Sequence, residues 1–302
     1  MRFSIWPNLQ QPWDDVAAIA HHADTTGWDG LYLADHFMGD AGGFGPVETP
    51  TFEATAGIAA LAASTTSLRL GTLVLSMTYR HPAVLANWAV TVDHISRGRL
   101  LLGVGAGWQE NEHEQYGIAL PPPKERVDRF AEGVQALDGL LRDPITSIDG
   151  AWYQLRDAVC EPKPVQAKLP LLIGGKGNRM LGIVARYADE WNMWSTPEMI
   201  RDRGAQLNRR CEQLDRDPSS IAWSTQAVVM LTDDESAARK FEEALAPRPA
   251  IGGTVERVAE VVAGWRDAGV EDVIIPDFVL GRGTKKLDAM DALIEHLGPA
   301  FR

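Results

Sequence analysis

Cysteine is nearly absent from this sequence: Cys160 and Cys211 are the two cysteines among 302 residues. They are too few and too widely separated for a disulfide framework or a Cys-rich metal site. The histidines do not follow an H-x-x-x-H or H-E-x-x-H spacing, so we expect no bound metal. This cysteine usage favours a reducing, cytoplasmic environment.

Positive charge and long apolar runs are also scarce. Asp and Glu number 41 against 29 Lys and Arg, which gives a formal net charge of -12. An acidic chain of this kind argues against a nucleic-acid-binding protein, because phosphate backbones require a basic surface. No apolar run approaches the roughly 20 residues of a membrane span, and the first residues, MRFSIWPN, lack a signal-peptide pattern. We therefore expect a small molecule as the partner, and neither nucleic acid nor membrane.

The chain instead alternates short apolar runs with stretches of helical periodicity. The runs that we interpret as strands are residues 2–7, 30–34, 68–75, 100–104, 171–173, 190–194, 221–231 and 273–276. Eight strand–helix repeats without a linker predict an α/β fold, a (β/α)8 TIM barrel, with residues 1–302 as a single domain. Loop insertions are expected at the Gly- and Pro-rich residues 40–50, which could form a lid. Asp149-Gly150, between β-prone runs, predicts a small β-hairpin insert.

Local signals predict three helix starts. Thr51 is the expected N-cap of a helix over residues 52–63, and Pro82 stands in the first turn of a helix that reaches about residue 95. Thr254 follows two glycines, Gly252 and Gly253, and precedes a helix over residues 255–268. It is either an N-cap or part of an anion site, and we favour the cap.

The stretch over residues 96–116, SRGRLLLGVGAGWQENEHEQY, joins a buried strand to a polar cluster. Its apolar run reads as a strand of a parallel sheet, buried on both faces. The run is followed by three residues with little or no side chain, Gly105, Ala106 and Gly107. Such residues indicate close approach of a ligand or of another backbone. A tight turn explains a single G-x-G equally well. For Gly107 we expect approach of a cofactor, rather than positive φ, to be the reason.

Polar side chains follow several of the expected strands. Because all strands of such a barrel point their carboxyl ends to one mouth, Asp35 and His36 should lie near residues 78–81, 108–112 and 174–176. Successive side chains of a strand point to opposite sides, so one of Asp35 and His36 can enter the mouth while the other braces a loop. A histidine suits proton transfer near neutrality, although it could equally serve to hold the following loop.

Gly174, Gly175, Lys176 and Gly177 stand between a strand and a helix. Open backbone N–H groups, a helix start and a lysine are the parts of a phosphate-binding loop. The segment matches neither the P-loop nor the Rossmann pattern, and a plain tight turn fits it as well.

Several segments together resemble a known family. They are DGLYLADHF (29–37), LGTLVLSMTYRHP (70–82), SRGRLLLGVGAGWQEN (96–111), LLIGG (171–175), ARYADEWN (185–192) and GGTVERV (252–258). With them the chain resembles, nearly end to end, the bacterial luciferase-like flavin and deazaflavin enzymes, especially the branch that uses coenzyme F420. The resemblance implies an oxidoreductase that moves a hydride between F420 and a small organic substrate.

The resemblance also implies a site across the strand ends. Asp35 and His36 would lie beside the deazaflavin, with His36 handling a proton, and a non-prolyl cis peptide near Leu73 and Val74 would back the ring. The other residues implied as cofactor contacts are Gly105, Ala106, Gly107 and Asn111 for the ring and its tail, and Gly174, Gly175 and Lys176 for the phosphate.

One position departs from the related sugar-phosphate dehydrogenases, which carry a catalytic Glu directly after the G-x-G. Here that position is Trp108, and the nearest acids are Glu110 and Glu112. This difference puts sugar phosphate as the substrate in doubt. We expect Trp108 to contact the cofactor and to form an apolar wall for an apolar or aromatic substrate, and Glu110 to be the catalytic acid.

Two other functions fit the same residues. An FMN-dependent monooxygenase of the same family would use the same phosphate loop, and a barrel could bind a cofactor or ligand without catalysis. In either case we expect a homodimer.

Overall fold

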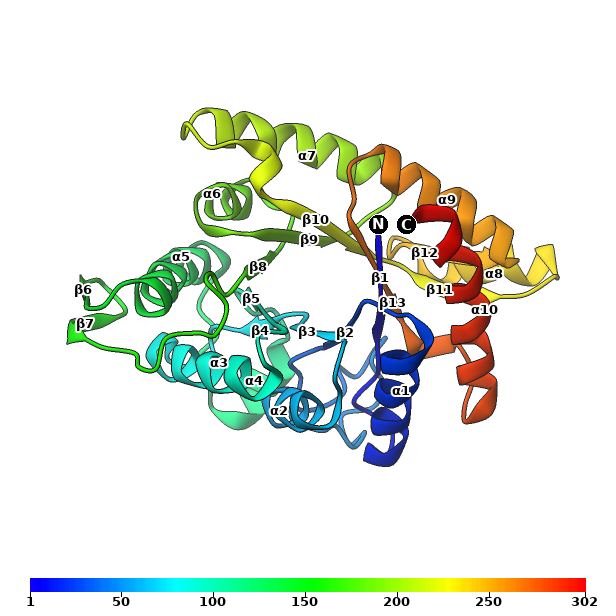
Figure 1. The fold of residues 1–302 in the computed structure, drawn as a ribbon, viewed down its shortest axis with the longest axis horizontal. Helices are drawn as coiled ribbons and strands as arrows, with labels where there is room; N and C mark the ends of the chain where they lie inside the picture. Colours follow the sequence, from blue (N-terminus) through cyan, green and yellow to red (C-terminus); the bar gives the residue numbers. More distant parts are fainter.

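A closed parallel barrel forms the centre of the computed structural model, which describes residues 1–302 (Figure 1). Its 9-stranded sheet runs in the order β3-β2-β1-β13-β10-β9-β8-β5-β4, and a further β3–β5 pairing closes the ring. Strands β3 (Arg69–Thr72) and β4 (Leu75–Ser76) are two parts of one barrel strand. Counted in this way the barrel has eight strands, which we call staves. The predicted (β/α)8 barrel is confirmed.

Each stave is followed by a helix that packs on its outer side, as Figure 1 shows. The other staves are β1 (Arg2–Trp6), β2 (Gly30–Leu33), β5 (Leu100–Gly105), β8 (Leu171–Gly174), β9 (Glu190–Trp194), β10 (Ala222–Gln226) and β13 (Asp272–Pro276). The outer helices are α1 (Trp13–Thr26), α2 (Ala54–Ser64), α3 (Pro82–Ser96), α5 (Pro123–Arg142), α6 (Asn178–Tyr187), α7 (Pro197–Glu212), α9 (Val255–Asp267) and α10 (Thr284–Phe301).

Two apolar clusters hold this arrangement together. The larger one, with 63 buried residues, lies between the staves and the helices. The smaller one fills the barrel and consists of Trp6, Tyr32, Leu73, Leu101, Leu172 and Ile274. Because the barrel interior is packed, ligands can be held only at its ends. The loops that leave the carboxyl ends of the staves build the end where active sites of this fold lie.

The stave expected over residues 221–231 divides at Ala227. Its second part, β11 (Val228–Leu231), leaves the barrel and pairs in parallel with β12 (Ala250–Gly253), a strand that we did not predict. Helix α8 (Glu235–Leu245) connects the two. Thr254 then caps α9, because its side chain accepts a hydrogen bond from the N–H of Arg257 at 3.4 Å. The N-cap interpretation of Thr254 is confirmed.

The predicted cap of α2 is wrong. The helix begins at Ala54, and Glu53 caps it by accepting a hydrogen bond from the N–H of Ala56 at 2.7 Å. The hydroxyl of Thr51 donates instead to the carbonyl oxygen of Thr49. Glu53 is held at this position by Arg80, a partner that lies far away in the sequence.

The predicted hairpin insert is present as β6 (Thr146–Asp149) and β7 (Gln154–Ala158), which pair antiparallel at the edge of the molecule (Figure 1). Residues 40–50 form a loop, with an isolated bridge between Gly42 and Gly45. One short helix, α4 (Glu110–Tyr116), was not predicted. It decides which acid enters the candidate site. None of the helices has the length and apolar character needed to cross a bilayer.

Candidate active site

His36 and Glu112 form the central contact at the carboxyl ends of the staves. The Nδ1 atom of His36 lies 3.0 Å from Oε1 of Glu112, and Oε2 of Glu112 accepts a hydrogen bond from the N–H of Phe37 at 2.9 Å. The Glu112 side chain is 1% exposed and that of His36 is 21% exposed. Because the carboxylate engages Nδ1, the other ring nitrogen of His36, Nε2, is left for a ligand.

Hydrogen bonds keep the Glu112 carboxylate ionised. Burial alone would raise the pKa of Glu112, but the hydrogen bonds from His36, from Tyr79 and from the N–H of Phe37 lower it below its ordinary value. Burial, together with the hydrogen bond to Glu112, raises the pKa of Tyr79. Tyr79 therefore stays a neutral donor, and Glu112 is a fixed negative charge behind His36.

A second histidine anchors helix α4 beneath this carboxylate. His113 Nδ1 donates to the carbonyl oxygen of Gln109 at 2.6 Å, and Nε2 lies 2.7 Å from Oγ1 of Thr78. The ring of Tyr79 packs on that of His113, with their centroids 4.6 Å apart. Helix α4 is thus tied to the segment that follows β4, and this connection positions Glu112.

Glu110, the acid that we expected to be catalytic, is not brought to His36. It is the first residue of α4, is exposed and makes no side-chain hydrogen bond. Two residues further along a helix the side chain points to the opposite side, so Glu112 faces inward where Glu110 faces solvent. Recognition of the ENEHEQY segment as a helix would have revealed this difference.

Asp35 and His36 diverge, as expected for neighbouring residues after a strand. The Asp35 carboxylate is 3% exposed. It accepts hydrogen bonds from Arg80 at 2.6 and 2.9 Å and from the N–H of Ser76 at 2.8 Å. Arg80 also bonds Glu53 at 2.7 Å. These contacts occupy the carboxylate, so Asp35 braces the staves rather than presenting a free oxygen to a cofactor.

The expected cis peptide is present between Leu73 and Val74. The side chain of Val74 lies against two glycines of neighbouring staves. A Cβ on Gly105 would stand 2.6 Å from Cγ2 of Val74, and a Cβ on Gly174 would stand 3.3 Å from its methyl groups. Gly105 and Gly174 therefore lack side chains because Val74 occupies that space, and Val74 forms an apolar floor at the ends of β5 and β8.

The explanation that we expected for Gly107 is wrong. Its φ is +83°, and a Cβ there would lie 2.5 Å from Oγ of Ser76 and 2.9 Å from Oγ1 of Thr78. Positive φ and close protein neighbours both require glycine, before any cofactor is considered.

Ala106 packs against the outer core. Asn111, the other residue expected near the tail, donates to the carbonyl oxygen of Gly39 at 2.8 Å and thereby holds the start of the loop over residues 40–50.

Gly174, Gly175 and Lys176 form an open turn between β8 and α6. Gly175 has φ +139° and donates its N–H to the carbonyl oxygen of Asn192 at 3.0 Å. Lys176 is exposed and makes no ion pair. Gly177 stands at the N-cap of α6, which has no side-chain cap. A free lysine beside uncapped helix N–H groups can hold an anionic group such as a phosphate.

Aromatic rings cover His36. The Phe44 ring, from the loop over residues 40–50, stacks on His36 with centroids 5.8 Å apart, and Trp108 meets His36 edge-on at 5.4 Å. The guanidinium of Arg248 lies over Phe44, 4.9 Å from its centroid. Trp108 is 52% exposed and forms a wall of the mouth, in the place that we expected. The cavity that remains beside His36 is about 30 Å³.

Two buried amide oxygens at the strand ends lack a partner, Oε1 of Gln109 and Oε1 of Gln226. Gln226, the last residue of β10, is 3% exposed, and its Oε1 makes no hydrogen bond. Ser224 bonds Asn192 of the neighbouring stave at 3.0 Å, and Gln226 shares its side of the strand by the two-residue repeat. A free amide acceptor here fits a flat cofactor that carries ring N–H donors. No group of three or more His, Cys, Asp or Glu is arranged to hold a metal ion.

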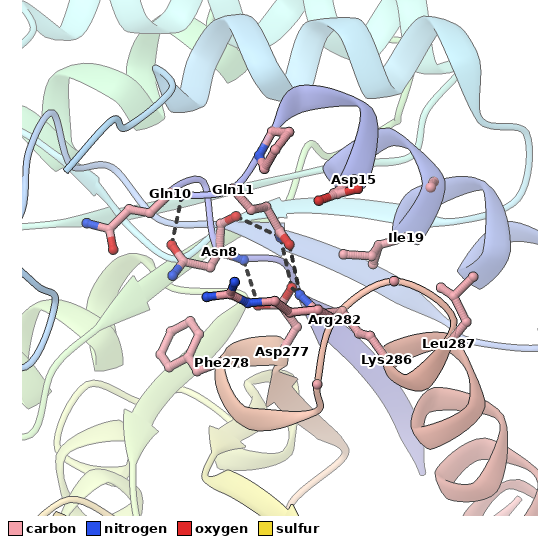
Figure 2. Close-up of a pocket in the computed structure, with 14 residues that line it drawn as sticks. Asn8, Gln10, Gln11, Asp15, Ile19, Asp277, Phe278, Arg282, Lys286 and Leu287 are labelled. Atoms are coloured by element: carbon pink, nitrogen blue, oxygen red, sulfur yellow. Dashed lines mark hydrogen bonds and ion pairs between the residues drawn. The ribbon is translucent and has the colours of Figure 1, made fainter.

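A much larger cavity, about 520 Å³, lies between the loops that follow β1 and β13 (Figure 2). Lys286 enters it from α10, with Nζ 2.5 Å from Oδ2 of Asp277 and 2.8 Å from Oε1 of Gln11. Asn8 and Phe278 line both this cavity and the small one beside His36. No local sequence pattern indicates this cavity, because segments from opposite ends of the chain build it.

Comparisons with known proteins identify relatives of this chain. The chain is 33% identical over 178 residues to an F420-dependent glucose-6-phosphate dehydrogenase of Beutenbergia cavernae, which covers 58% of this chain and 51% of that protein. It is 34% identical over 173 residues to a 4-hydroxyprotoasukamycin monooxygenase of Streptomyces nodosus subsp. asukaensis, covering 56% of this chain and 42% of the relative. The matches thus span about half the length of these relatives.

Solved structures share the fold. An F420-dependent secondary alcohol dehydrogenase in complex with an F420-acetone adduct superposes with a TM-score of 0.83 at 18% identity, covering 98% of both chains. The monooxygenase RslO1 from Streptomyces bottropensis superposes with a TM-score of 0.85 at 20% identity, covering 100% of both. The sequence pattern of the family described as luciferase-like monooxygenase matches residues 1–246. The chain therefore belongs to the luciferase-like monooxygenase family.

Proposed function

We propose that this protein is an F420-dependent oxidoreductase that transfers a hydride between the deazaflavin and a small organic substrate. The observation that carries the proposal is His36, oriented by the buried carboxylate of Glu112 at the same mouth as Val74 and Lys176. The relatives named as F420-dependent dehydrogenases support the choice of cofactor. When bound, F420 supplies the hydride chemistry, and the protein supplies position and proton transfer.

The residues present fit such a cofactor. Leu73 and Val74 would support the ring from the floor of the mouth, and the unpartnered Oε1 of Gln226 would accept a hydrogen bond from a ring N–H. Lys176 and the open turn at Gly174 and Gly175 would hold the phosphate. Gly105, Ala106 and Gly107 would border the ring, while Asp35 and Asn111 act by bracing the surrounding loops.

His36 is proposed to exchange a proton with the substrate through Nε2. Glu112 engages Nδ1, so it selects the tautomer and stabilises the imidazolium that forms when Nε2 takes up a proton. Glu110 is exposed and makes no hydrogen bond to His36, so we assign this role to Glu112. Trp108 and Phe44 shield His36 from water, which suits an apolar or aromatic substrate.

An FMN-dependent monooxygenase is the second candidate. The relative named 4-hydroxyprotoasukamycin monooxygenase favours it, and the open turn at Lys176 suits either phosphate. A barrel that binds a ligand without catalysis is disfavoured, because a buried, ionised carboxylate paired with a partly exposed histidine at a barrel mouth is an arrangement typical of catalytic sites.

Titration of the purified protein with F420 and with FMN, followed by absorbance and fluorescence, tests the proposal. We expect saturable binding of F420 and weaker or no binding of FMN. Tight binding of FMN without binding of F420 would transfer the assignment to the monooxygenase. If F420 binds but no reductant or oxidant in a broad panel changes its absorbance, the non-catalytic barrel is the better description.

We also propose a cytoplasmic homodimer built from one-domain subunits. The core cluster includes residues from Phe3 to Leu297, which supports one domain. Both cysteines are unpaired, as suits a reducing compartment.

Val84 and Ile95 are exposed on the same face of α3, which fits a self-complementary contact between two subunits. Light scattering would then give twice the 33.0 kDa chain mass for the wild type and a smaller mass for Val84→Glu.

A further inference from the structure

The cavity between the loops after β1 and β13 has the size of a ligand site. Its volume of about 520 Å³ lies within the range of roughly 300–1,000 Å³ typical of small-molecule pockets. Seven of its 14 lining residues carry polar or charged side chains, so the lining combines polar groups with apolar surface. Asn8, Gln10 and Phe278 line both this cavity and the one beside His36, so the two are neighbours. A ligand held in the larger cavity therefore lies next to the His36 side of the mouth.

The floor of the cavity is neutral. Asp277 is 1% exposed, and its carboxylate accepts hydrogen bonds from the N–H of Asn8 at 2.8 Å and from Nε2 of Gln11 at 2.9 Å. Lys286 completes its hydrogen bonds and cancels its charge. Figure 2 shows these groups turned toward one another beneath the cavity. This ion pair is thus a structural support that leaves no free charge for a ligand.

Arg282 is the cation that remains free. It is exposed and makes no ion pair and no hydrogen bond, and Figure 2 shows its side chain extended toward Asn8 and Phe278. Gly281 and Gly283 flank it with φ values of +101° and +56°. A side chain held between two glycines can reorient as a ligand enters.

We propose that this cavity binds a carboxylate of the organic substrate, with Arg282 as its partner, next to Asn8 and Phe278, which border the His36 cavity. The planar guanidinium matches the two oxygens of a carboxylate. Arg282 supplies one positive charge, which matches one carboxylate. A dianionic phosphate would lack a second free cation and would bring a further negative charge toward Asp15, the exposed acid that also lines the cavity. The assignment of the ligand as the substrate rests on the proposed function, whereas carboxylate binding does not.

Fluorine NMR titration of the cofactor-free protein tests the proposal with three probes: 4-fluorophenylacetate, 4-fluorophenylacetamide and 4-fluorobenzyl phosphate. We expect the wild type to bind the acetate about tenfold more tightly than the amide, as a charge-assisted hydrogen-bonded pair provides. Arg282→Gln should remove this preference, and Arg282→Lys should keep only part of it. Lys285→Gln removes a neighbouring exposed cation that does not line the cavity, and it should keep the full preference.

Three results would overturn the proposal: equal affinity of the wild type for acetate and amide, an unchanged preference in Arg282→Gln, or tighter binding of the phosphate ester than of the acetate. The titration with F420, carried out on the same variants, separates the two proposals. A protein that fails to bind F420 but shows the Arg282-dependent carboxylate preference would refute the proposed function alone.

Discussion

The Nδ1 atom of His36 lies 3.0 Å from Oε1 of Glu112, a contact that links the end of β2 to helix α4 across 76 positions of the chain. The carboxylate is buried and the imidazole is partly open to the mouth. This arrangement leaves Nε2 as the imidazole nitrogen that can contact a substrate. It also places a negative charge next to Nδ1, where it would stabilise a protonated imidazole.

Glu112→Gln should lower turnover by about 10- to 100-fold, because a neutral amide neither selects the tautomer of His36 nor stabilises its protonated form. F420 affinity should stay within about threefold, and the pH–rate profile should lose its dependence on a stabilised imidazolium. Steady-state kinetics across pH measure both effects. Glu110→Gln, on the exposed side of α4, is the control and should match the wild type. Equal losses in both variants would contradict the role of Glu112.

His36→Ala should depress turnover by roughly 10²–10⁴-fold with cofactor binding nearly intact, as expected when a proton-transfer group is removed. Turnover and F420 fluorescence titrations provide the two readouts. If F420 binding were lost together with turnover, His36 would instead be a structural residue that holds the aromatic cover of Phe44 and Trp108.

Lys176→Glu should weaken F420 binding, because it reverses the one free cation at the open turn before α6. The affinity of the wild type should fall as salt is added, since exposed charges are screened. Lys240→Glu makes the same charge change on the exposed face of α8 and should leave the affinity unchanged. A similar loss in both variants would point to net charge rather than to a local contact.

Gly107→Ala should destabilise the cofactor-free protein by about 1 kcal/mol or more, because alanine must adopt positive φ there and its methyl group meets Ser76 and Thr78. Urea unfolding measures the change. Gly117→Ala is the matched control, with φ +66° and no atom within 4 Å of the added Cβ. It should cost less than Gly107→Ala. A cofactor-free Gly107→Ala protein as stable as the wild type would show that the local backbone relaxes.

Asp272→Asn should change the pH dependence of stability. Asp272 is fully buried, and burial, together with the charge of Glu190, raises its pKa from 3.8 to about 6. The folded state then binds the proton more tightly than the unfolded state. The associated stability is complete below pH 3.8 and is lost as pH rises through about 6. From pH 4 to pH 7 the wild type should lose on the order of 2 kcal/mol relative to the variant, measured by urea unfolding at both values. A pH-independent difference would contradict the raised pKa.

Sequence periodicity determined most of the barrel. A buried parallel strand requires only a short apolar run between turn signals, and the helix that follows requires apolar residues at helical spacing. Residues 190–194 and 235–245 satisfy these local rules, and the structure has β9 and α8 over the same residues. Asp149-Gly150 likewise specifies its hairpin through local turn chemistry. By contrast, β12 escaped prediction because its short run, containing Gly252 and Gly253, gains its strand character only from pairing with β11.

For the candidate site too, some features follow from local sequence and others only from the tertiary structure. The residues of the strand ends, among them His36 and Lys176, follow from the sequence because barrel closure sends every carboxyl end to one mouth. Which acid contacts His36 depends on how α4 is rotated about its axis. The need for glycine at position 107 depends on Ser76 and Thr78, which come from another part of the barrel. The cavity at Arg282 needs the first and last staves to be neighbours. Periodicity acts over a few residues, whereas contacts between distant segments exist only after the ring has closed.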